Sequence, residues 1–338
     1  SRSPRLLDSS TSRLLDSTPR LPDSPTAVMI GYLLRRIVQM APVLFLLTLF
    51  VFFLVRMVPG DPAEVMLGNR ATPENVAIVR QRMGLDKPIW EQYAIFLGNA
   101  VRGDLGKSVR RGDPVASMLV DRLPPTLFLV AYAMALAVLI SVPLATWSAL
   151  HRDRTPDQLT RVVVLVSLAM PTYWVGMMLL QFFAVKYKFF PVAGYGDTVL
   201  EHFHSLFLPA LSLGLATASI MTRALRNSIL ETVGADYVRT ARAKGLTSRR
   251  VLVWHVLRNS VLSTVTILGI NLAFLIGGTT IIETIFAIPG IGQLIIKAIF
   301  DRDYPIIQGA TLAFGVLVLA INLLTDLSYA LLDPRVSY

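Results

Sequence analysis

The sequence predicts an all-α membrane protein with six transmembrane helices, and three observations lead to this fold class. Of the 338 residues, 54% are hydrophobic and 16% are charged, whereas about a quarter of a soluble domain is charged. Six stretches are apolar over the roughly 20 residues that a helix needs to cross a bilayer. The net charge of +10 comes from Lys and Arg gathered in short segments between those stretches, which is typical of topology signals.

The first element is a polar arm, residues 1–28. It holds three near-copies of a Leu-x-Asp-Ser pattern, interrupted by Pro and Ser, and these offer little apolar area to bury. We expect this arm to be disordered. Met29 is a candidate for the natural start of the chain.

The six predicted spans then follow in order, and the basic residues orient them. The lead-in to the first span holds Arg35 and Arg36, and the segment 223–258 holds eight Lys and Arg against two acids. Because basic segments stay on the inner side, both termini are predicted to be cytoplasmic, and the long segment 59–124 external. The predicted spans are residues 37–58, 126–150, 162–185, 203–221, 261–282 and 307–329.

The external segment 59–124 is predicted to fold as a small helical cap. Thr72 and Pro73 form a helix start, with Pro in the first turn. A second short helix is expected around residues 93–97, where apolar residues cluster.

The segment 223–258 is predicted to be a structured basic element. Residues 236–244 are compatible with a helix, and Gly245 stands where a left-handed residue ends one. Thr247 is then expected to cap a second short amphipathic helix with Val251, Trp254 and Leu257 on one face. The charge alone would also suit a loop that attracts anionic lipid headgroups. Such a loop, however, would need neither the Gly245 turn nor the Thr247 cap. A DNA-binding helix pair is disfavoured because these helices are tied to membrane spans.

Here the chain resembles the permease subunits of binding-protein-dependent ABC importers. Their general Glu-Ala-Ala signature, followed by Gly, corresponds to Arg239, Thr240, Ala241 and Gly245, so the Glu and the first Ala are replaced. Over residues 29–338 the chain closely resembles permeases of the dipeptide/oligopeptide/nickel branch. In these systems two permeases work as a pair, and the chain resembles the first of them. The motifs that carry it are Asp236-Tyr-Val-Arg-Thr-Ala-Arg-Ala-Lys-Gly-Leu246, Val58-Pro-Gly-Asp-Pro62, Leu85-Asp-Lys-Pro88, Gly103-Asp-Leu-Gly106, Arg258-Asn-Ser260, Glu283-Thr-Ile-Phe286, Pro289-Gly-Ile-Gly292 and Leu332-Asp-Pro-Arg335.

The resemblance implies a type I ABC importer permease fold in a bacterial inner (plasma) membrane. It implies a homologous second permease, two ABC ATPase subunits and an extracytoplasmic solute-binding protein as partners, besides the lipid bilayer. The chain itself would hold no cofactor and perform no covalent chemistry, since ATP and Mg would be bound by the ATPases. The expected solute is a short peptide, with nickel, glutathione or an oligosaccharide as alternatives.

The same resemblance assigns ATPase coupling to the 223–258 segment within the 29–338 permease domain. The residues expected to couple are Asp236, Tyr237, Arg239, Thr240, Ala241, Arg242, Lys244, Gly245 and Leu246. Polar residues inside spans are candidates for the substrate pathway because they are costly there. They are Asn271, Gln181 and Glu283, and for Glu283 capping or gating by the next loop is an equal alternative.

Other signals are weaker. Gly106-Lys107-Ser108 ends like a phosphate-binding loop, but Val101 stands where that loop needs its first Gly. His202 and His204 fall short of a metal ligand set, and a surface pair is the better interpretation. A secondary transporter would favour paired charges within the spans, and a membrane-embedded enzyme a nucleophile with its base there; neither pattern is seen.

Overall fold

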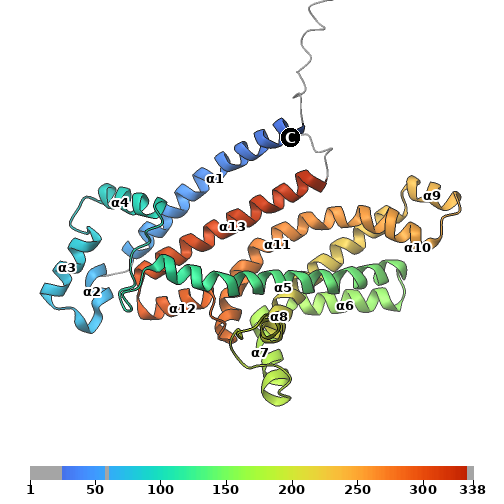
Figure 1. Cartoon of the computed structure of the whole chain (residues 1–338). Helices are drawn as coiled ribbons and strands as arrows, with labels where there is room; N and C mark the ends of the chain where they lie inside the picture. The colour runs from blue at the N-terminus through green and yellow to red at the C-terminus, as the bar shows by residue number, and fades with distance from the viewer. Residues whose placement is uncertain (1–24, 58–60, 333–338) are drawn as a thin grey trace, which may run out of the picture.

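The computed structural model describes residues 25–57 and 61–332, and long helices dominate these ranges (Figure 1). Within them there is no β-strand beyond an isolated bridge between Lys107 and Pro114. The prediction of an all-α fold is confirmed. The long helices are α1 (Pro25–Arg56), α5 (Val115–Leu150), α8 (Val199–Val233), α11 (Arg258–Ile285) and α13 (Tyr304–Leu332).

Four of these helices are long and apolar enough to cross a membrane, judged by length and composition over the described residues. They are α5 and α8 in full, with Arg35–Leu54 of α1 and Tyr304–Thr325 of α13. In α11, Asn271–Ile285 is a shorter apolar helix among the described residues. Five of the six predicted spans thus fall on these helices.

The third predicted span, residues 162–185, is not one continuous helix. It is divided between α6 (Thr155–Ala169) and α7 (Thr172–Leu179), which the π-helical turn η2 (Leu180–Lys186) extends, and the two parts are bent by 99°. The break falls at Met170 and Pro171, both with extended backbone. Pro171 has no N–H to continue the helix, and its ring pushes the preceding residue out of the helical region.

The described part of segment 59–124 contains short helices, as predicted. Thr72 accepts a hydrogen bond from the Asn75 backbone N–H at 3.2 Å and so caps its helix. Tyr93 joins the segment to α1, because its hydroxyl lies 2.9 Å from that of Thr48. The elements are α2 (Pro62–Leu67), the 3-10 turn η1 (Gly68–Arg70), α3 (Pro73–Met83) and α4 (Ile89–Val101).

Two predicted boundaries differ from the structure. Residues 1–24 of the predicted arm lie outside the described residues, and residues 25–28 already belong to α1. Helix α5 begins at Val115, before the predicted start at 126, and takes in the last residues of the predicted 59–124 segment. It contains Pro124 and Pro125, which membrane helices tolerate when neighbours satisfy the freed backbone groups.

The arrangement of the helices separates two regions of interest. Figure 1 shows α2–α4 at one end of the molecule and α9 (Asp236–Ala243) and α10 (Ser248–Arg250) at the other. Between them, α5 packs along α8, and the central core includes Leu129, Leu206 and Ile276 from α5, α8 and α11. The basic segment is therefore carried at the end of the bundle opposite the helical cap.

Candidate functional site

The basic segment begins with α9, whose end follows the prediction closely. The Gly245 backbone has φ +78°, in the left-handed region, and its N–H donates to the Arg242 carbonyl at 2.9 Å. Side chains with a Cβ are disfavoured in that region, which explains a Gly at this turn. The predicted helix and its left-handed end are confirmed.

The second helix differs from the prediction. Thr247 occupies the N-cap position, but its side chain makes no capping hydrogen bond. The helix that follows does not end as a separate short element. It runs from α10 through the π-helical turn η3 (Val251–Leu257) directly into α11, and no Gly or Pro interrupts residues 246–268.

The π-helical turn also changes which residues share a face. The sequence predicts one face for Val251, Trp254 and Leu257, but Val251 is 2% exposed and Trp254 is 61% exposed. Instead, Val251 and Val256 are buried together. They are five residues apart, which suits the wider π-helical turn and not the α-helical turn assumed in the prediction.

Helix α9 is anchored to the rest of the chain by its apolar face. Val238 and Ala241 are buried in one cluster with the ends of the two central helices and with η3. Ala241, 5% exposed, therefore contacts this chain's own helices and is not on the face open to a partner. The other members of the cluster, referred to below as the anchor cluster, are Ala145 and Ala149 of α5, Leu225 and Ile229 of α8, and Val251 and Val256 of η3.

The opposite face of α9 is open and carries two basic residues, Arg239 and Arg242. Tyr237 on this face is tied to α11, because its hydroxyl accepts a hydrogen bond from the Asn259 amide at 3.1 Å. Asp236 and Arg239 form an exposed ion pair at 3.8 Å. Of the residues expected to couple, Leu246 is half-buried, and the exposed ones are Asp236, Tyr237, Arg239, Thr240, Arg242, Lys244 and Gly245.

A buried ion-pair network beside the anchor cluster was not predicted. The Asp157 carboxylate on α6 is fully buried and accepts two hydrogen bonds from the Arg226 guanidinium on α8, at 2.6 and 2.7 Å. It also accepts from Ser148 on α5 and from Arg161, both at 2.6 Å. The network thus joins three helices where α9 is anchored. Only the Asp157–Arg161 spacing of four residues was visible in the sequence.

The structure does not gather the three candidates for the substrate pathway into one polar site. Gln181 is exposed on η2, and Asn271 is half-buried in α11. Glu283 is fully buried, and its hydrogen bonds go to neither of them.

Glu283 instead holds the start of a short helix, α12 (Ile291–Asp301). Its carboxylate accepts hydrogen bonds from the Thr126 hydroxyl at 2.7 Å and from the Gln293 backbone N–H at 3.0 Å. Thr126 in turn accepts from the Ile291 N–H at 3.0 Å. A Cβ on Gly290 would overlap the carboxylate. Of the two interpretations, the geometry supports capping, since these contacts satisfy backbone N–H groups in the first turn of α12, which have no partner within the helix.

The two histidines near the start of α8 hold a loop through hydrogen bonds to its backbone. His202 Nδ1 donates to the Tyr195 carbonyl at 2.9 Å, and His204 Nε2 donates to the Phe189 carbonyl at 3.0 Å. Glu201 belongs to the capping box of α8 with Thr198. No group of three or more His, Asp or Glu suited to a metal ion occurs among the residues that the structure describes.

Comparison with known proteins assigns this arrangement to a family. Residues 141–338 match the binding-protein-dependent transport system inner membrane component, and residues 29–130 match the N-terminal region of such components. The chain belongs to this family. It is therefore a multi-pass inner-membrane permease subunit of an ABC importer, a class that is not itself catalytic and that works with an ATPase, a binding protein and a second permease.

Individual relatives agree with this assignment. The permease is 36% identical over 310 residues to the glutathione transport system permease protein GsiC of Escherichia coli and of Shigella dysenteriae, covering 92% of this chain and 100% of each relative. Its fold is similar to that of the MetNI methionine ABC transporter in an inward-facing conformation. That likeness has a TM-score of 0.53 at 17% identity, over 64% of this chain and 96% of the other. The shared fold confirms the predicted type I architecture.

Proposed function

We propose that this permease imports short peptides and that the exposed face of α9 is its contact with a partner ATPase. The observation that carries the proposal is the two-sided character of α9. Val238 and Ala241 fix one face to α5, α8 and η3, while Arg239 and Arg242 extend from the other. A short helix held in this way can receive a force and pass it on, because it does not move independently of the helices beneath it.

The proposed cycle follows from that anchoring. Closure of two ATPase subunits around ATP and Mg, which they hold and this chain does not, pushes on α9. The anchor cluster passes the movement to α5 and α8, and the Asp157–Arg226 ion pairs carry it to α6. Rigid-body movement of packed helices is a common way to switch between two states. The switch exposes the solute path alternately to the outer and inner sides.

The orientation belongs to the same proposal. Segment 223–258 and both termini face the cytoplasm, and segment 59–124 faces the solute-binding protein outside. The separation of α9 and α10 from α2–α4 to opposite ends of the molecule supports this assignment (Figure 1).

Glutathione is the second candidate solute, and one observation favours it. The relatives at 36% identity are named as glutathione transport permeases. Glutathione is itself a tripeptide, so both candidates belong to one chemical class with free carboxylates and an amine. A nickel chelate or an oligosaccharide remains the further alternative within the same machinery.

The test is to reconstitute the permease with its second permease, both ATPases and the binding protein in vesicles. We expect dipeptides and tripeptides to stimulate ATP hydrolysis and to accumulate inside, with glutathione compared directly against an ordinary tripeptide. Stimulation by nickel or by a sugar alone would contradict the peptide proposal. Uptake that continues without the ATPases would favour a secondary transporter.

A further inference from the structure

A groove of about 1380 Å³ runs along α10, η3 and the start of α11, where the basic segment leads into the fifth predicted span, residues 261–282. The charged side chains that line it are all basic. Arg249, Arg250 and Arg258 contribute to it, and no Asp or Glu does. Among the residues that the structure describes, no ion pair engages any of these three guanidinium groups. The groove therefore attracts anions.

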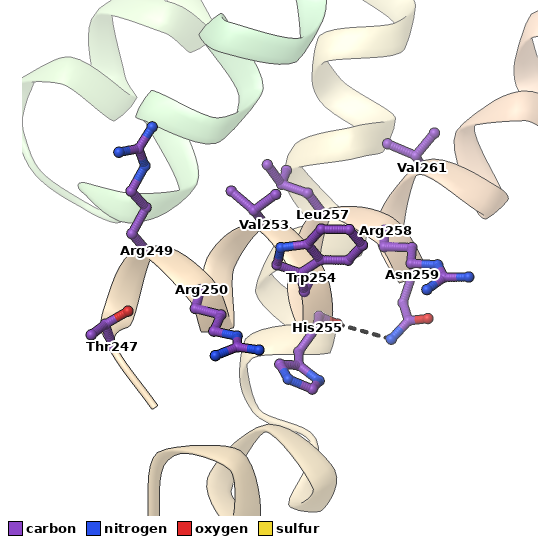
Figure 2. A pocket seen from close by; sticks show the side chains of 10 residues that line it. All are labelled: Thr247, Arg249, Arg250, Val253, Trp254, His255, Leu257, Arg258, Asn259 and Val261. Carbon is purple, nitrogen blue, oxygen red and sulfur yellow. Dashed lines mark hydrogen bonds between the residues drawn. The ribbon is translucent and has the colours of Figure 1, made fainter. Parts of the chain in front are cut away.

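The same groove is also apolar along one side. Val253, Trp254 and Val261 are exposed in it. In Figure 2, Val253 and Val261 point to the upper side of the view, Arg250 to the lower side, and the Trp254 ring lies between them. Val261 belongs to α11, so the apolar side is the one that leads along the apolar helix. Trp at the border between apolar and charged surroundings is typical of a membrane–water interface.

We propose that this groove binds an acidic phospholipid. The phosphate lies between Arg250 and Arg258, and an acyl chain follows Val253 and Val261 along α11. Guanidinium groups bind phosphate oxygens through charge-assisted hydrogen bonds, and basic pockets at the inner ends of membrane helices suit acidic headgroups. An acidic segment of a protein would match the arginines but not the exposed valines, whereas a phospholipid matches both.

This inference goes beyond the proposed function and requires only that the start of α11 lies at the membrane surface. It gives the second half of the basic segment a role distinct from that of α9. The lipid would hold η3 against the bilayer, and η3 carries Val251 and Val256 of the anchor cluster.

The test is native mass spectrometry of the whole complex, permeases and ATPases together, purified from membranes that contain phosphatidylglycerol. The double variant Arg250→Gln/Arg258→Gln should bind this lipid about thirtyfold more weakly and lose one molecule per copy of the chain. Arg250→Lys/Arg258→Lys keeps the charge and should keep the lipid, which separates binding from folding. The matched control, Arg152→Gln/Arg154→Gln, removes the same charge from the α5–α6 connection and should keep it too.

A second measurement identifies the position of the lipid. In nanodiscs, brominated phosphatidylglycerol should quench the fluorescence that Trp254→Phe removes, and brominated phosphatidylcholine should quench it less. Equal lipid retention in the Gln variant and the wild type would overturn the proposal. So would a Gln variant that releases the ATPases while keeping its lipid, because the groove would then belong to the ATPase. Neither lipid measurement depends on transport, so a wrong solute or coupling assignment would not affect them.

Discussion

At the residue scale, Ala241 and Ala243 stand two positions apart on α9 in opposite environments, since Ala241 is buried in the anchor cluster and Ala243 is exposed. We predict that Ala241→Leu destabilises the permease by about 1–3 kcal/mol, because added methylene groups overpack a filled core. Ala243→Leu is the control and should change stability little. Thermal unfolding of the permease pair without ATPases measures both, and equal effects would mean that α9 is not anchored as described.

Glu283 and Gly290 give a second pair of predictions at this scale. Gly290→Ala should displace the Glu283 carboxylate and loosen the start of α12, because the new Cβ has no free space. Gly277→Ala on the same helix as Glu283 is the control, since a Cβ there meets nothing within 4 Å. We expect Gly290→Ala to lower the unfolding temperature and solute uptake, and Gly277→Ala to lower neither. If the control were equally harmful, displacement of the Glu283 carboxylate would not explain the effect of Gly290→Ala.

At this scale, a residue's role could be predicted from the sequence when its partners are close to it along the chain, and not when they are distant. Gly245 was predictable because a left-handed helix end is a local feature. Glu283 was singled out, but its partner Thr126 is 157 residues away, so the sequence left capping and substrate contact open. Asp157 was missed because it lies near a basic loop, where a carboxylate is usually exposed.

At the scale of elements, the Asp157 network holds α5, α6 and α8 together. We predict that Asp157→Asn destabilises the permease by about 3–5 kcal/mol, because removing one partner leaves the Arg226 charge buried without compensation. Asp153→Asn is the matched control, because Asp153 is 69% exposed and its pairs with Arg152 and Arg161 are exposed. That change should cost less than about 1 kcal/mol.

Chemical or thermal unfolding of the purified complex measures this difference. The double variant Asp157→Asn/Arg226→Met removes the unpaired charge and should regain part of the loss. Similar stability of Asp157→Asn and Asp153→Asn would show that the network does not hold the helices together.

Most membrane-spanning helices could be predicted from the length of the apolar stretches in the sequence. The exceptions have local causes. The third span bends at Pro171 because proline ends the helix, a consequence that a hydropathy count does not contain. The second helix of the basic segment continues into α11 because nothing in its sequence stops it, and its faces follow a π-helical period that α-helical spacing cannot reveal.

At the scale of the whole molecule, the orientation can be tested because the sequence contains no cysteine. We predict that a single Cys at Lys107 reacts with a membrane-impermeant maleimide from outside intact cells. A Cys at Arg249 should react only after the membrane is opened. Both positions are exposed to solvent, so a difference reports the side of the membrane. The reverse pattern would invert the assignment of the cap and of the basic segment.

The most direct test of the central claim is cross-linking from α9 in the assembled importer. A single Cys at Arg239, on the exposed face, should form a disulfide or a short maleimide cross-link with the ATPase subunit, and ATP should change its yield. A Cys at Asn75 in the external cap should give none. If Cys residues at Arg239 and Arg242 both failed to cross-link while the ATPases remained bound, α9 would not be their contact.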